Sequence, residues 1–161
     1  MKKTDFLLRL KKGGKIKIVE PNEELKESYI NKSNHSLNSS TILLQNNEIE
    51  NAIPLAYYSM YNMLTALLYK TGIKCENHTA SIIILKDLFN IDNSQIKFAK
   101  RERVEKQYYT DFKLAKKDVE DLIDKAKNFN AVVYDFVEKL TKKQIEDYRK
   151  EIKECLDEEE R

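Results

Sequence analysis

The segment of residues 55–68 constrains the fold more than any other part of this chain, because it contains no charged residue and no glycine. A helix that is apolar on nearly all sides must be buried on nearly all sides. The segment therefore predicts the central helix of a bundle, or a helix shared between two subunits. Along it, a polar stripe at helical spacing consists of Tyr58, Asn62, Thr65 and Tyr69. Buried polar groups of this kind need hydrogen-bond partners.

Hydrophobic spacing and capping signals predict helices along most of the remaining chain. The expected helices cover residues 4–12, 22–46, 48–72, 77–90, 94–108 and 119–140, and a last one follows Thr141. Residues 15–19 alternate between charged and apolar side chains, which predicts a short extended arm. Three glycines and two prolines are too few for the many turns of a sandwich or barrel. The predicted fold is all-α, an up-and-down helical bundle of five to six helices.

Two of these helices have a face that is expected to point into the core. In the 22–46 helix that face carries Leu25, Tyr29, Ser33, Leu37, Ser40 and Leu44. In the 119–140 helix, spacings of three and four place Val119, Leu122, Ala126, Phe129, Val133, Phe136 and Leu140 on one seam. Thr141 and Gln144 have the spacing of a capping box, which predicts the start of the last helix.

Charge divides the chain into three expected parts. Residues 1–21 form a basic leader, with seven positive and one negative residue in its first 17 positions, a net of +6. Residues 22–140 form the helical bundle. Residues 141–161 form a C-terminal helix with an acidic end, where two positive and six negative residues from 151 onwards give a net of −4. Both ends are interpreted as solvated segments.

Composition favours a soluble protein without a membrane partner. Charged residues make up 35% of the chain, yet the net charge is only +2, which indicates a surface of mixed sign. No apolar run approaches the roughly 20 residues that span a bilayer. Without a secretory signal, the two distant cysteines are expected to be reduced, which predicts a cytoplasmic location. Two isolated histidines and two distant cysteines predict no metal site and no cofactor.

The candidate site for chemistry is the basic segment of residues 97–109. Its cations are Lys97, Lys100, Arg101, Arg103 and Lys106, and Tyr108 and Tyr109 follow them. A guanidinium binds phosphate oxygens bidentately and an aromatic ring stacks on a base, so the segment suits a nucleotide or RNA ligand. On composition alone, a solvated helix face with paired charges is the favoured interpretation. Similarly, His78 is interpreted as packing on the preceding helix rather than as a catalytic residue.

The order of these motifs resembles the HEPN family of small helical proteins. The resemblance rests on the tyrosine-rich segment 56–61, on Gly72-Ile73-Lys74 followed by His78, and on residues 103–109. It covers roughly residues 22–140. It implies a helical bundle, usually a homodimer, with a groove between the second and fourth helices. Many members are metal-independent ribonucleases, and many are encoded beside a minimal nucleotidyltransferase in prokaryotic toxin–antitoxin pairs. Others bind nucleotides or serve as non-catalytic modules.

This chain departs from the motif of the nuclease members, which is Arg followed by His after four to six residues. No histidine follows Arg101 or Arg103 at that spacing. Histidine suits proton transfer near neutral pH, whereas tyrosine, with a pKa of about 10, is a poorer base. The resemblance therefore implies a nucleotide- or RNA-binding protein without the usual ribonuclease activity, and no catalytic residue is assigned.

The same resemblance implies a set of ligand-binding candidates, namely Arg103, Tyr108, Tyr58, Asn62 and Arg101. Arg103 is expected to bind phosphate, while Tyr58 and Asn62 satisfy Arg103 or the ligand. A purely structural hydrogen-bond network is the alternative role for these residues. Two other functions stay open. One is a metal-independent toxin-type endoribonuclease that uses Arg103 with a tyrosine or with His78, and the other is a structural partner of a minimal nucleotidyltransferase.

Overall fold

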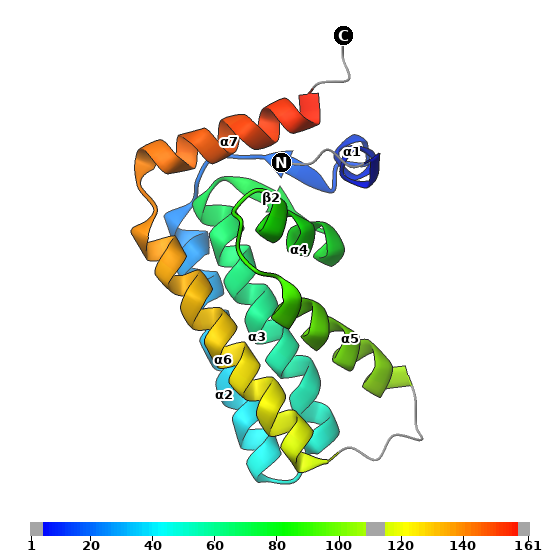
Figure 1. The fold of residues 1–161 in the computed structure, drawn as a ribbon. Coiled ribbons are helices and arrows are strands. Elements are labelled where there is room, and N and C mark those ends of the chain that lie inside the picture. Colours follow the sequence, from blue (N-terminus) through cyan, green and yellow to red (C-terminus); the bar gives the residue numbers. More distant parts are fainter. Residues whose placement is uncertain (1–4, 109–114, 158–161) are drawn as a thin grey trace.

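The computed structural model describes residues 5–108 and 115–157, and for residues 106–108 it describes the backbone alone. Within them lie seven helices and two short strands (Figure 1). The order is α1 (Asp5–Lys12), β1 (Ile16–Ile18), α2 (Glu23–Gln45), α3 (Ile49–Lys70), β2 (Ile73–Cys75), α4 (His78–Asp87), α5 (Ser94–Tyr108), α6 (Lys116–Lys139) and α7 (Lys142–Asp157). The all-α bundle is confirmed. The described helices outnumber the five to six expected in the bundle, and α1 corresponds to the helix expected over residues 4–12 in the leader.

Helix α3 is the central helix of the bundle. It packs against α2, α6, α5 and α4 and against β2, and in Figure 1 it runs between α6 and α5. Its apolar residues are covered by these neighbours of the same chain, and Tyr57, Met60 and Leu64 are fully buried. The central position follows from the absence of any charged face along residues 55–68.

Helix α6 buries the seam that its heptad spacing predicts. Val119, Leu122, Ala126, Phe129 and Val133 are all buried. At its far end Phe136 is half-buried, and its ring lies 6.0 Å from Phe89 and 6.3 Å from Tyr148, measured between centroids. This aromatic cluster connects α6 with the end of α4 and with α7.

Capping residues begin the helices where the sequence predicts them. The Asn22 side chain accepts a hydrogen bond from the Leu25 amide at 2.8 Å, and the Asn77 side chain accepts one from the Ala80 amide at 2.9 Å. The capping box before α7 is also present. In it the Thr141 amide donates to Gln144 Oε1, and the Gln144 amide donates back to Thr141 Oγ1.

The two strands form a small antiparallel sheet in which Ile16 faces Cys75 and Ile18 faces Ile73. The extended arm at residues 15–19 was expected, but its partner was not, because the three residues of β2 are too few for a periodic pattern. Gly72 has a positive φ of 70°, and a Cβ there would lie 2.4 Å from the Val19 carbonyl oxygen. The Arg149 guanidinium of α7 donates to this carbonyl and to that of Thr71. The sheet and α7 are therefore joined at one end of the bundle.

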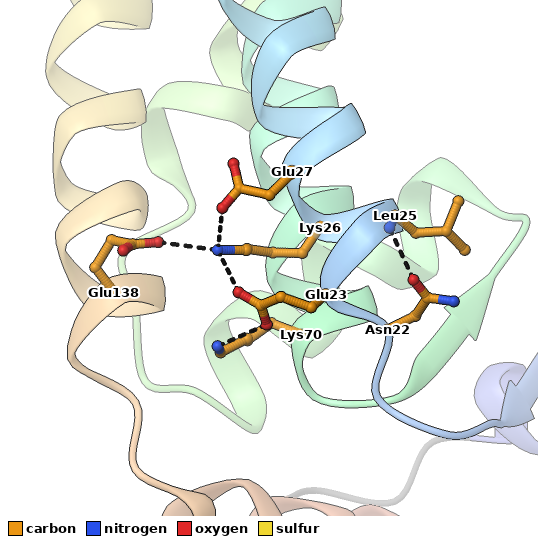
Figure 2. Close-up of polar contacts among 7 residues, drawn as sticks. All are labelled: Asn22, Glu23, Leu25, Lys26, Glu27, Lys70 and Glu138. Atoms are coloured by element: carbon orange, nitrogen blue, oxygen red, sulfur yellow. Dashed lines mark hydrogen bonds and ion pairs between the residues drawn. The ribbon is translucent and has the colours of Figure 1, made fainter.

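The core face of α2 differs from the expected one at its beginning. Leu25 is 37% exposed, whereas Lys26 is only 2% exposed. The Lys26 ammonium lies 2.6 Å from Glu23 Oε1 and 3.2 Å from Glu138 Oε1 of α6, and it also pairs with Glu27 (Figure 2). Burial lowers the pKa of Lys26, but these three carboxylates raise it more, so the ammonium stays charged. We call these four residues the Lys26 cluster.

Candidate functional site

Arg103 of α5 lies against two consecutive tyrosines of α3. The carbon atom at the centre of its guanidinium is 5.1 Å from the Tyr57 ring centroid and 5.2 Å from that of Tyr58. Its Nη1 donates a hydrogen bond to the Tyr58 hydroxyl at 3.3 Å. Tyr57 is buried, whereas Tyr58 is 38% exposed, so the guanidinium lies where the core meets the surface. The contact between Arg103 and Tyr58 is the one that the sequence led us to expect.

His78, the first residue of α4, also contacts Tyr57. Its Nδ1 is 2.7 Å from the Tyr57 hydroxyl oxygen, and its ring stacks on Tyr61 at 3.7 Å between centroids with an 18° interplanar angle. Packing against α3 was the role expected for His78. Burial and then the positive charges of Arg103 and Lys100 lower the pKa of His78, so the imidazole is neutral at neutral pH.

The hydrogen bond to Tyr57 determines which nitrogen of this neutral imidazole carries the proton. Burial raises the pKa of the Tyr57 phenol, which therefore keeps its proton. Among the described residues, His78 Nδ1 is the hydrogen-bond partner found for that phenol. The phenol thus donates to Nδ1, and the remaining proton of the imidazole is on Nε2. His78 presents an N–H donor rather than a free lone pair.

Lys100 adds a second cation on the same face of α5, three residues before Arg103. Its ammonium donates to the Thr79 hydroxyl at 2.5 Å. Burial and then the nearby charge of Arg103 lower the pKa of Lys100. Neither cation has a carboxylate partner in the described part of the chain, where Arg103 Nε is also buried without a hydrogen-bond partner. We call Lys100, Arg103 and the neutral His78 near them the cation site, since the charges of the two cations are left uncompensated.

The other candidates from the sequence lie elsewhere. Asn62 donates to Ser36 Oγ of α2 at 3.5 Å, so its side chain makes a contact between α3 and α2 rather than with Arg103. Arg101 is exposed, lies over the Phe98 ring and pairs with Glu105 at 4.0 Å. Two residues correspond to about 200° around a helix, which separates Arg101 from Arg103. The Tyr108 side chain lies outside the described residues.

Two members of this arrangement, Lys100 and His78, were not among the ligand-binding candidates from the sequence. The i, i+3 spacing of Lys100 and Arg103 was a usable signal, because such residues share a helix face. No local signal brings His78 to Tyr57, because that contact depends on how α4 packs on α3. In the ranges 5–108 and 115–157, no three His, Cys, Asp or Glu side chains gather as metal ligands would. None of the helices in those ranges is long and apolar enough to cross a membrane.

Comparison with known proteins identifies the family. The HEPN domain matches residues 26–140, which is most of the chain. The matched region contains α3, α4, α5 and α6 and therefore the entire cation site, while α1, β1 and α7 lie outside it. No curated protein was found to match the chain. The tyrosine-rich central helix, the helical bundle and the matched region agree, and the chain belongs to the HEPN family.

Proposed function

We propose that this protein binds a phosphate group of a nucleotide or RNA at the cation site and does not cleave it. One observation carries the proposal: Lys100 and Arg103 are half-buried cations on one face of α5, and neither has a carboxylate partner among the described residues. Bringing two positive charges together costs free energy that an anion recovers. A guanidinium and an ammonium are both donors suited to phosphate oxygens.

The protonation of the site supports binding without cleavage. Cleaving RNA through its own 2′-hydroxyl requires a group that takes a proton near neutral pH. The Nδ1 lone pair of His78 is occupied by the Tyr57 hydroxyl, and burial moves the pKa of Tyr57 further from neutrality. No histidine follows Arg103 along α5 at the spacing of the nuclease members.

The test is a calorimetric titration of wild type and two variants with ATP, pyrophosphate and a short RNA. Arg103→Gln removes the guanidinium from the site, and Arg101→Gln makes the same change in charge on the exposed side of α5. We expect Arg103→Gln to weaken binding about tenfold, which is typical for the loss of one charge-assisted hydrogen bond. Equal affinities for the two variants would contradict the proposal.

A metal-independent endoribonuclease is the second candidate function. It is favoured by the position of His78, which shares Tyr57 with Arg103 although it comes from a different helix. RNA incubated with purified protein at neutral pH in the presence of a chelator tests this activity. Cleavage that is lost in both His78→Gln and Arg103→Gln would establish it. If the RNA stays intact, binding without cleavage remains as the proposed function.

The family also suggests a homodimer and a minimal nucleotidyltransferase partner. Support for an interface comes from α6, where Val132 is a large apolar side chain with 57% exposure. Light scattering of the wild type and of Val132→Glu tests the homodimer, which the variant should shift towards monomer. Co-purification with the product of the adjacent gene, expressed together, tests the second partner.

A further inference from the structure

Helices α2 and α6 lie side by side (Figure 1), and residues of both line a groove of about 530 Å³. Ile30, Leu37 and Met63 form its apolar part, and the last of these belongs to the central helix α3. The volume falls within the roughly 300–1,000 Å³ that is typical of ligand sites. The cation-site residues are not among those that line this groove, so we treat the α2–α6 groove as a separate feature of the bundle.

Asn130 brings an unpaired polar atom to this groove. It is one of the lining residues, yet it is only 6% exposed. Its amide nitrogen donates to the Ser59 hydroxyl oxygen at 2.6 Å, and Ser33 Oγ donates to the Ser59 carbonyl at 2.8 Å. The amide oxygen of Asn130 is buried and has no hydrogen-bond partner anywhere in the described chain. A buried acceptor without a partner is unfavourable, so a ligand that brings an N–H group to it gains binding free energy.

The rim of the groove presents neutral amides rather than free charge. Asn31 and Asn34 of α2 are exposed, and neither has a hydrogen-bond partner among the residues that the structure describes. Both charged residues of the lining, Glu27 and Lys127, are already in ion pairs. A ligand with a net charge therefore gains little here, which separates this groove from the cation site and disfavours a phosphate group as its occupant.

An extended, uncharged peptide segment has the chemistry that suits such a groove. Each peptide group carries one N–H and one C=O, and an asparagine amide can pair with both. Side chains alternate along an extended segment, so an apolar one can lie against Met63 while the backbone passes Asn130. A helix is a poorer occupant, because most of its backbone N–H groups are already bonded within the helix.

We propose that the α2–α6 groove binds an extended, uncharged segment of a partner protein. A backbone N–H of that segment donates to Asn130 Oδ1, an apolar side chain lies against Met63, and Asn31 and Asn34 pair with neighbouring peptide groups. Solvent barely reaches Asn130 Oδ1, so the exposed residues at the rim move aside as the segment enters. The inference goes beyond the proposed function and is independent of it, because anion binding at the cation site needs none of these residues.

A phage-displayed library of short random peptides tests the groove without a known partner. Peptides enriched on the full-length wild type are synthesised with capped ends and titrated against wild type, Ala131→Arg and Asn128→Arg. Ala131 is an exposed residue of the lining, so Ala131→Arg fills the groove. Asn128→Arg is the matched control, because Asn128 is exposed on the same helix and does not line the groove. Thermal melting confirms that both variants are folded.

We expect the enriched peptides to lack charged residues, to bind wild type and Asn128→Arg equally and to lose binding to Ala131→Arg. The Asn130 side-chain amide signal should shift in NMR spectra when the peptide is added. Replacing each peptide amide in turn by an ester, which lacks the N–H, should weaken binding about tenfold at one position.

Three results would overturn the proposal: no enriched peptide, equal binding to wild type and Ala131→Arg, or an ester series without effect. Peptides that pyrophosphate displaces would belong to the cation site, which also overturns it. Self-association that is lost in Ala131→Arg, with no peptide bound by the wild type, would assign the groove to a second copy of this chain instead.

Discussion

The Lys26 cluster and the cation site treat positive charge in opposite ways. Lys26 is almost completely buried, and three carboxylates surround it (Figure 2). Lys100 and Arg103 are half-buried, and no carboxylate partner is found for them among the described residues. A compensated buried charge connects helices, whereas an uncompensated one remains available to an external anion. The comparison separates a structural cation from a candidate binding cation in the same bundle.

The largest effect is expected at Lys26. The change Lys26→Ala removes a buried aliphatic stem and leaves Glu23, Glu27 and Glu138 facing one another, so α2 loses this ion pair with α6. We expect the free energy of unfolding to fall by roughly 2 kcal/mol, mostly from the lost burial of the stem, because the three carboxylates are themselves exposed. Chemical denaturation measures this loss. A variant as stable as Arg101→Gln would mean that the cluster is not structural.

The next change makes the cation site resemble the Lys26 cluster. Thr79 is exposed and accepts a hydrogen bond from Lys100, so Thr79→Asp places a carboxylate beside the two cations, in the first turn of α4 where acidic residues are favourable. We expect pyrophosphate affinity to fall about tenfold, while the melting temperature stays constant or rises. Thr79→Asn, which has the same shape without the charge, is the control. Equal affinity in Thr79→Asp and wild type would place the anion elsewhere.

A smaller effect concerns pH. Burial and the charges of Arg103 and Lys100 hold the pKa of His78 below its ordinary value of about 6.5. The unfolded chain therefore takes up a proton more readily than the folded one. This contribution to stability is fully present above about pH 6.5 and is lost as the pH falls from there to the lower folded value. Chemical denaturation at several pH values measures how the free energy of unfolding changes with pH. In this window that change should be smaller for His78→Gln than for the wild type. An equal pH dependence in the two proteins would mean that the folded structure does not lower the pKa of His78.

The smallest effect is expected at Arg101. Its ion pair with Glu105 is long, at 4.0 Å, and both side chains are exposed. Such pairs contribute about 0.5 kcal/mol or less, so Arg101→Gln should change neither stability nor anion affinity measurably. The same thermal melts and titrations used for Arg103→Gln check it. A loss of affinity as large as that of Arg103→Gln would remove the distinction between the two faces of α5.

Strongly patterned helices were predictable from the sequence, and less patterned ones only in part. Helices α3 and α6 followed from an uncharged segment and a heptad seam. In α2 the expected face was wrong at its start, because apolar spacing favoured Leu25 over Lys26. The long aliphatic stem of a lysine can be buried when acids meet its ammonium, and two of those acids are neighbours while Glu138 comes from α6.

The candidate site was predictable only as far as one contact. The resemblance pointed to Arg103 and Tyr58, and their hydrogen bond is present. Asn62 lies four residues after Tyr58 on the same stripe, yet α5 covers the earlier residue and α2 the later one. Helical spacing states which residues share a face, but it does not state which neighbouring helix covers each part of that face. The place of His78 depends on that tertiary information.

The Arg149 guanidinium connects the last helix to segments that lie far from it in the sequence. It donates to the carbonyls of Val19 and Thr71, which flank the two-stranded sheet. A protein shortened to the HEPN-matched residues would keep Lys100 and Arg103 on α5 but would lose β1 together with these contacts of α7. We therefore expect the flanking segments to contribute to the stability of the end of the bundle where the sheet lies.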